Sequence, residues 1–181
     1  MSTFTVVHVL LSVIGIGAGF LVVGGLLTGK RLPLWTEVFL GTTFATSATG
    51  FGFPFEKVLP SHIVGVISIA VLAVAVWALY KRRLQGRWRA TYAIAAVASL
   101  YLNVFVLVAQ SFLKVEAFRQ AAPTQSEPPF AIAQLAVLIM FGYLGLVSAK
   151  SFSQENAEPA LLGSSPARSE SWSGTEKIQR A

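Results

Sequence analysis

Five runs of mostly apolar residues divide the chain, and each is about as long as a helix that crosses a membrane. A helix needs about 20 apolar residues to pass through the hydrocarbon core of a bilayer. The runs therefore predict an all-α fold, an integral membrane five-helix bundle built from residues 1–150. The predicted spans cover residues 4–28, 34–53, 62–80, 91–113 and 130–149.

The composition excludes a soluble enzyme or a nucleic-acid-binding domain. Hydrophobic residues make up 54% of the 181 residues and charged residues only 12%, whereas about 25% of the residues in a soluble domain are charged. The net charge of +6 lies in short clusters between the apolar runs, so we expect no nucleic-acid partner. The lack of cysteine excludes disulfides, iron–sulfur clusters, thiolate zinc sites and covalently attached haem.

Lysine and arginine set the predicted orientation, because loops rich in these residues stay in the cytoplasm. With five crossings, the loops on the side of the N-terminus contain Lys57, Lys114 and Arg119. The opposite side carries Lys30, Arg31, Lys81, Arg82, Arg83, Arg87, Arg89 and Lys150. We therefore expect the N-terminus outside. Residues 151–181 are rich in Ser, Glu, Gly and Pro, and we expect a disordered tail in the cytoplasm.

The second run is the most polar of the five, since it contains Thr42, Thr43, Thr46, Ser47 and Thr49. A re-entrant segment would explain this polarity, but it would leave the basic residues of the next loop outside. We therefore predict a spanning helix that its neighbours shield from lipid. Its small residues lie three or four positions apart, as in helices that pack closely. Gly41, Ala45, Ala48 and Gly52 are predicted to pack against the first helix, near Gly15 and Gly19.

The fourth run carries a stripe of polar residues on one helical face, because their spacings of seven and four residues match the helical repeat. The stripe consists of Tyr92, Ser99, Asn103, Gln110 and Lys114. Asn103 lies near the middle of the membrane, where an amide must face protein or water. An interhelical hydrogen bond is the favoured role for this amide.

Crossing parity brings both histidines of the chain, His8 and His62, to the external side. Water and lipid headgroups would satisfy histidines at helix ends, whereas neutral imidazoles from two helices could ligate a haem b iron or a divalent metal. A third possibility is a pocket for a quinone, a lipid or a small solute. The side chains predicted to bind such a ligand are Asn103, Gln110, Lys114, Glu127 and Gln134.

The chain contains four distinctive short motifs, which are TGFGFP at 49–54, PSHI at 60–63, YLNVF at 101–105 and APTQSEPPF at 122–130. These motifs resemble those of a family of small, uncharacterised, multi-pass bacterial inner-membrane proteins. The resemblance extends over about residues 5–150 and leaves out the tail. It implies a location in the bacterial inner membrane, and it brings no catalytic residue, metal site or cofactor to this chain.

The leading functional hypothesis is a protein that binds a small ligand or serves as an accessory subunit through the external polar cluster. Its expected protein partner is another membrane subunit or a second copy of the chain. The alternative is a haem b- or quinone-linked redox protein in which His8 and His62 take part. A small-solute transporter ranks third, because the five runs contain no evident inverted repeat. The chain carries no motif for nucleotide binding, hydrolysis or phosphoryl transfer, so catalysis is not favoured.

Overall fold

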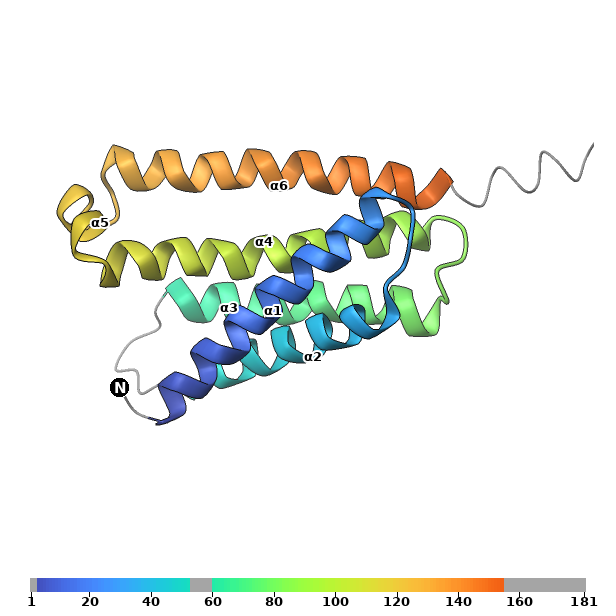
Figure 1. Ribbon diagram of the computed structural model, residues 1–181, viewed down its shortest axis with the longest axis horizontal. Helices are drawn as coiled ribbons and strands as arrows, with labels where there is room; N and C mark the ends of the chain where they lie inside the picture. The colour runs from blue at the N-terminus through green and yellow to red at the C-terminus, as the bar shows by residue number, and fades with distance from the viewer. Residues whose placement is uncertain (1–2, 53–59, 155–181) are drawn as a thin grey trace, which may run out of the picture.

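A computed structural model describes residues 3–52 and 60–154, with the side chains of 60–62 and 154 left aside. These residues are helical apart from short turns, which confirms the all-α prediction. Five long helices lie side by side, and each runs antiparallel to the one before it (Figure 1). The elements are α1 (Thr3–Leu27), α2 (Pro33–Gly50), α3 (Pro60–Val76), η1 (Trp77–Lys81), α4 (Trp88–Lys114), α5 (Glu116–Ala121) and α6 (Pro128–Gln154).

Four of these helical stretches are long and apolar enough to cross a membrane. They are Thr3–Leu27, Ile63–Lys81, Trp88–Lys114 and Pro128–Ser153. By helix length and hydropathy the chain is therefore a multi-pass membrane protein. α2 is not among the four, although it was predicted to span. It has 18 residues, and at 1.5 Å per residue it is about 27 Å long.

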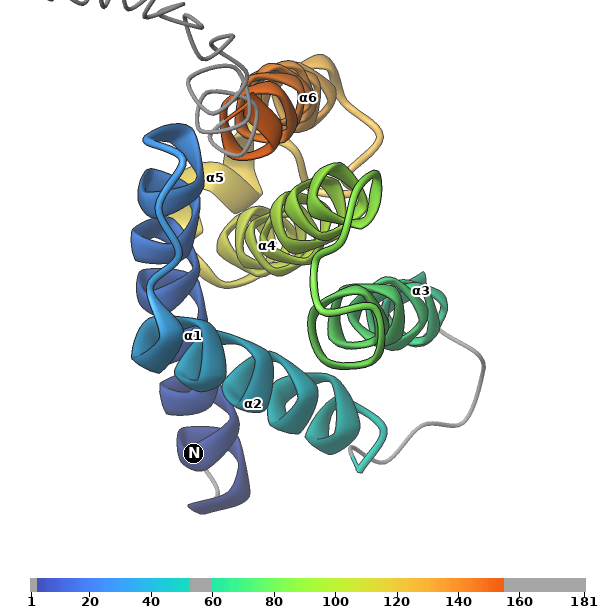
Figure 2. The ribbon, with the colours of Figure 1, turned by 90° about the vertical axis from the view of Figure 1, so that its right-hand side faces the viewer.

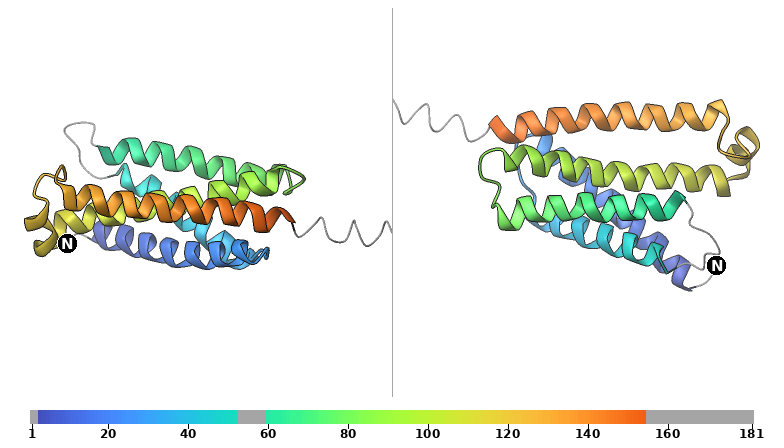
Figure 3. Two further views of the ribbon diagram at one scale, coloured as in Figure 1. Left: turned by 90° about the horizontal axis from the view of Figure 1, so that it is seen from above. Right: turned by 180° about the vertical axis from the view of Figure 1, so that it is seen from behind.

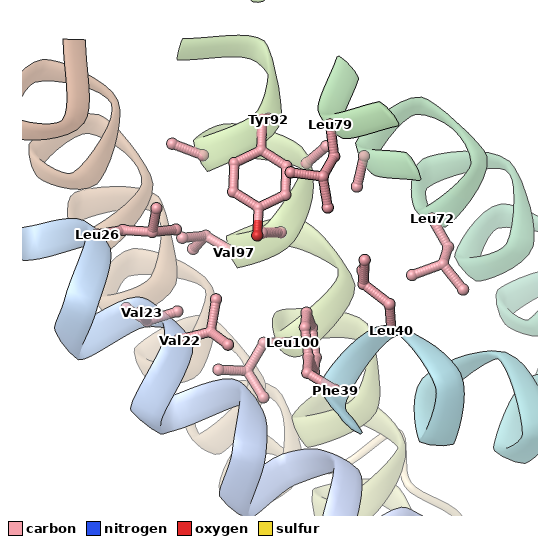
Figure 4. Close-up of a cluster of buried hydrophobic side chains, with 14 of the residues drawn as sticks. Val22, Val23, Leu26, Phe39, Leu40, Leu72, Leu79, Tyr92, Val97 and Leu100 are labelled. Atoms are coloured by element: carbon pink, nitrogen blue, oxygen red, sulfur yellow. The ribbon is translucent and has the colours of Figure 1, made fainter. Parts of the chain in front are cut away.

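The core of the bundle is centred on α4, which lies between α1, α3 and α6 in the end-on view (Figure 2). Tyr92 and Leu100 of α4 are fully buried. They meet aliphatic side chains of α1 and the ring of Phe39 on α2 (Figure 4). The other labelled members of this core are Val22, Val23, Leu26, Leu40, Leu72, Leu79 and Val97.

α6 is the least buried of the four apolar helices and packs mainly along α4. At one end the Arg89 Nε donates a 2.7 Å hydrogen bond to the backbone oxygen of Phe152, and the guanidinium lies 4.2 Å from the centre of the Phe152 ring. The outward face of α6 is apolar and exposed, as expected for a surface in contact with lipid tails. This face carries Ile132, Leu135, Leu138, Ile139, Met140 and Leu146.

The two ends of the bundle differ in charge. The α1–α2 turn, the η1–α4 turn and the end of α6 lie together, and we call this the basic end (Figure 3). The start of α1, the end of α4, α5 and the start of α6 lie at the opposite end, which we call the α5 end. The basic end carries Lys30, Arg31, Lys81, Arg82, Arg83, Arg87, Arg89 and Lys150.

The turn between α1 and α2 is closed by a glycine in the left-handed conformation. The N–H of Lys30 donates to the oxygen of Gly25 at 2.9 Å, and the N–H of Gly29 donates to the oxygen of Leu26 at 3.1 Å. Gly29 has a φ of 74°, which a residue with a side chain rarely adopts. This pattern is a Schellman motif, and it ends α1 just before the basic pair Lys30–Arg31.

The prediction that the small residues of α2 pack against α1 is wrong for Gly41 and Ala48, which are exposed. A Cβ added to Gly41 would meet no heavy atom within 4 Å. α1 instead contacts the neighbouring face, where a Cβ on Gly15 would lie 3.0 Å from the Oγ1 of Thr42. The physical reason is that Thr36, Thr43 and Thr49 on this face meet polar side chains of other helices, namely Tyr92, Asn103 and His8.

Candidate functional site

α2 turns its hydroxyl groups toward the neighbouring helices, and this inward polar face organises the interior of the bundle. The Oγ1 of Thr36 lies 3.4 Å from the phenol oxygen of Tyr92 on α4. The side chain of Thr43 is fully buried, and its Oγ1 accepts a 3.1 Å hydrogen bond from the Nδ2 of Asn103 on α4. Buried polar groups need such partners, because water is excluded from the interior. The polarity of α2 is therefore consistent with a helix inside a membrane bundle.

The polar stripe of α4 divides into a buried half and an exposed half. Tyr92 and Ser99 are fully buried, and Asn103 is half-buried and bonded to α2. Gln110 and Lys114, closer to the α5 end, are exposed. The Oγ of Ser99 has no hydrogen-bond partner among the residues that the structure describes. The stripe therefore packs against protein in the half with Tyr92 and Ser99, and it is exposed in the half with Gln110 and Lys114.

His8 is held between α1 and α2 near the α5 end. Its Nδ1 lies 2.8 Å from the Oγ1 of Thr49, and this hydroxyl also lies 2.8 Å from the oxygen of Ala45. The Nδ1 of His8 and the Oγ1 of Thr49 share one hydrogen bond, and the imidazole tautomer decides which of the two atoms donates. This hydrogen bond fixes the orientation of the His8 ring between α1 and α2.

The second predicted cofactor ligand, His62, lies in the first turn of α3, but its side chain is outside the described residues. The start of α3 is at the same end of the bundle as the start of α1 (Figure 1). Within residues 3–52 and 60–154, no group of three His, Cys, Asp or Glu side chains could hold a metal ion. Ligation by the two histidines stays a prediction.

The carboxylate of Glu127 stabilises the loop between α5 and α6 through hydrogen bonds. It accepts hydrogen bonds from the N–H of Thr124 at 3.2 Å, the hydroxyl of Thr124 at 3.0 Å and the N–H of Ser126 at 3.1 Å. Desolvation acts against the charged form, but the hydrogen bonds to the carboxylate outweigh it and lower the pKa of Glu127 below its usual value. The ionised side chain is therefore part of the loop structure.

Two glutamines fasten this loop and the start of α6 to the backbone of α4. The Nε2 of Gln125 donates to the oxygen of Ala109 at 2.7 Å, and the Nε2 of Gln134 donates to the oxygen of Phe105 at 3.1 Å. The two acceptors lie one helical turn apart. Gln134 was a predicted site residue, whereas Gln125 was not; its position inside a proline-flanked loop was the available signal.

Aromatic rings complete the α5 end. The Phe112 ring of α4 stacks on Phe118 of α5 with centroids 5.2 Å apart, and it meets the edge of Phe130 of α6 at 5.4 Å. On the outer side of α5, Glu116 pairs with Arg119 and accepts a 3.0 Å hydrogen bond from Gln120. We call α5, the loop 122–127 and these rings the cap.

The five predicted ligand-binding side chains therefore have different surroundings. Glu127 and Gln134 lie at the cap and bind the loop and the α4 backbone. Asn103 lies deeper and binds α2. Gln110 and Lys114 are the two that stay exposed, one turn apart on α4.

A groove between α2 and α3 was not anticipated from the sequence. Its volume is about 290 Å³, and it lies on the half of the bundle near the basic end. Its lining consists of Glu37, Leu40, Gly41, Phe44, Leu72, Val76 and Tyr80. One feature of the sequence could have pointed to this groove. Glu37 is an acidic residue on the side of the bundle where nearly all charges are basic.

Comparison of the chain with protein-family models, curated proteins and solved structures gives no match. The resemblance to a family of small inner-membrane proteins is therefore supported only at the level of a multi-pass helical membrane architecture.

Proposed function

We propose that the chain is a bacterial inner-membrane protein with five spans, an external N-terminus and a cytoplasmic C-terminus. The charge difference between the two ends supports this orientation, since the basic end would face the cytoplasm. The inward polar face of α2 supports its role as the fifth span. Its hydroxyl groups bind α1, α4 and its own preceding turn, so crossing would not expose them to lipid.

Within this topology we propose a binding or accessory role at the external cap, with a partner membrane subunit or a small ligand as its target. The observation that carries the proposal is the set of contacts through which Glu127, Gln125 and the ring of Phe112 join the cap to α4 and to itself. A surface fixed in advance loses little conformational entropy when it binds.

The cap also offers groups that a partner could contact. Val115 and Phe118 are each 46% exposed, although both are apolar. Gln110 and Lys114 are exposed beside them and would receive an acceptor or an anionic group. Asn103, Glu127 and Gln134 would act indirectly, by holding the bundle and the cap in shape.

The test is the mass of the full chain purified in a mild detergent. We expect the wild type to carry a stoichiometric second subunit, a second copy or a bound small molecule, and Phe118→Ser to lose it. Phe20→Ser is the matched control, because Phe20 is similarly exposed at 45% but lies on α1, outside both the cap and the groove between α2 and α3. A monomer without bound species, or equal losses in both variants, would contradict the proposal.

A further inference from the structure

The groove between α2 and α3 has a buried apolar floor and an exposed rim. Leu40 and Leu72 form the floor and are 6% and 3% exposed. The rim consists of exposed side chains from both helices, among them Phe44 and Val76. Gly41 leaves the groove open on the α2 side, because a Cβ there would meet no atom within 4 Å. The groove therefore opens toward the surface that lipid would cover.

The α3 side of the groove ends in a π-helical turn. η1 covers Trp77–Lys81, and the N–H of Arg82 donates to the oxygen of Trp77 at 3.0 Å, five residues back. Such turns shift the register of the residues that follow, and they occur frequently at functional sites. Here the turn places Tyr80 on the groove, with the cation of Lys81 next in the chain.

Glu37 lies at the mouth of the groove and has an unusual setting. Within the described part of the chain, Glu37 is the one acidic residue at the basic end, and its side chain is exposed. Among the described residues, none of the neighbouring cations forms an ion pair with it. Glu37 lies about one turn inside the start of α2, which begins at Pro33.

We propose that this groove binds one phospholipid with a primary-amine headgroup, such as a phosphatidylethanolamine. An acyl chain would lie on Leu40 and Leu72, and the ammonium group would donate charge-assisted hydrogen bonds to Glu37. The phosphate would lie at the Tyr80 end of the groove, which is the end closer to the basic end of the bundle. Charge complementarity within the groove selects this occupant: Glu37 is the charged residue of the lining and would pair with an ammonium group, whereas a choline headgroup has no N–H to donate.

The test is lipid binding to the delipidated full chain, followed by native mass spectrometry. Phosphatidylethanolamine and phosphatidylcholine with the same acyl chains have the same net charge, so the pair isolates the effect of the amine. We expect the wild type to bind the amine lipid about tenfold more tightly, which corresponds to one charge-assisted hydrogen bond. Glu37→Gln should bring this ratio close to one.

A second variant tests the groove itself. Gly41→Leu should remove one bound lipid of either type, because its side chain would fill the groove. Gly142→Leu is the matched control, since Gly142 of α6 also has no atom within 4 Å of an added Cβ. It should leave lipid binding unchanged.

Four results would overturn the proposal. The first is a preference for the amine lipid that survives Glu37→Gln, and the second is a lipid count that Gly41→Leu does not lower. The third is competition by soluble glycerophosphoethanolamine as strong as that of the lipid, which would identify a free amine as the ligand. The fourth is a dimer mass that Gly41→Leu abolishes without changing lipid binding, which would identify a second copy as the occupant.

Discussion

At the scale of single residues, Thr43 and Asn103 show how this bundle accommodates polar side chains. A hydrogen bond from the Asn103 amide to the Thr43 hydroxyl joins α4 to α2 and gives the fully buried Thr43 a partner. Hydrogen bonds between membrane helices contribute about 0.6 kcal/mol on average and up to about 1.7 kcal/mol. The buried position of Thr43 argues for the upper part of this range.

We expect Asn103→Leu to lower the free energy of unfolding by about 1 kcal/mol, because it leaves the Thr43 hydroxyl without its donor in a buried site. Ser99→Ala is the control, since the Ser99 hydroxyl is buried with no partner among the described residues. Unfolding in mixed micelles measures both variants. Equal stability of the two would mean that the amide contributes nothing through Thr43.

The lowered pKa of Glu127 makes the loop structure depend on pH. Because the folded pKa lies below the ordinary value of 4.5, the stabilisation is complete above that value and disappears as the pH falls through the folded pKa. Hydrogen exchange at the amides of Thr124 and Ser126, corrected for the intrinsic effect of pH, would follow this change. Glu127→Gln should give fast exchange at neutral pH, and slow exchange in that variant would refute the role of the charge.

At the scale of the elements, some features of α2 could be predicted from the sequence and others could not. Residue spacing identified its length and its polarity, and both follow from local patterns. The side that faces the interior could not be read from spacing, because the small residues and the threonines are both at helical intervals. Only the positions of Tyr92, Asn103 and His8 on other helices make the hydroxyl face the buried one.

The turn after α1 allows a sharp test with two adjacent glycines. A Cβ on Gly25 would lie 2.9 Å from the backbone oxygen of Lys30, whereas a Cβ on Gly24 would meet nothing within 4 Å. Gly25→Ala should therefore lower the free energy of unfolding by about 1 to 3 kcal/mol, and Gly24→Ala should leave it nearly unchanged. Thermal unfolding of both variants in one detergent decides the matter, and similar melting temperatures would contradict the packing of this turn.

At the scale of the whole molecule, the alternating directions of the five long helices and the charge difference between the two ends could be predicted from the sequence. Both depend on counts and lengths that need no three-dimensional information. The cap and the groove were not within reach, because each depends on side chains from different helices. Gln125, for example, acquires its role only through the carbonyl of Ala109, sixteen residues earlier in the chain.

The proposed orientation can be tested with single cysteines, since the natural chain has none. Ala121→Cys at the cap and Gln85→Cys at the basic end are both exposed positions. In intact cells a membrane-impermeant maleimide should label the first and should reach the second only after permeabilisation. The reverse pattern would place the cap in the cytoplasm and invalidate the proposed external site.

The contacts that hold α6 and the loop before it against α4 have unequal tolerance to mutation. Arg89, Gln125 and Gln134 each donate to a main-chain oxygen, and every amino acid supplies that oxygen. Substituting Phe105 or Ala109 therefore cannot delete an acceptor, while substituting a donor deletes the whole bond. Over evolutionary time, the positions that supply acceptors are free to change faster than the positions that supply donors.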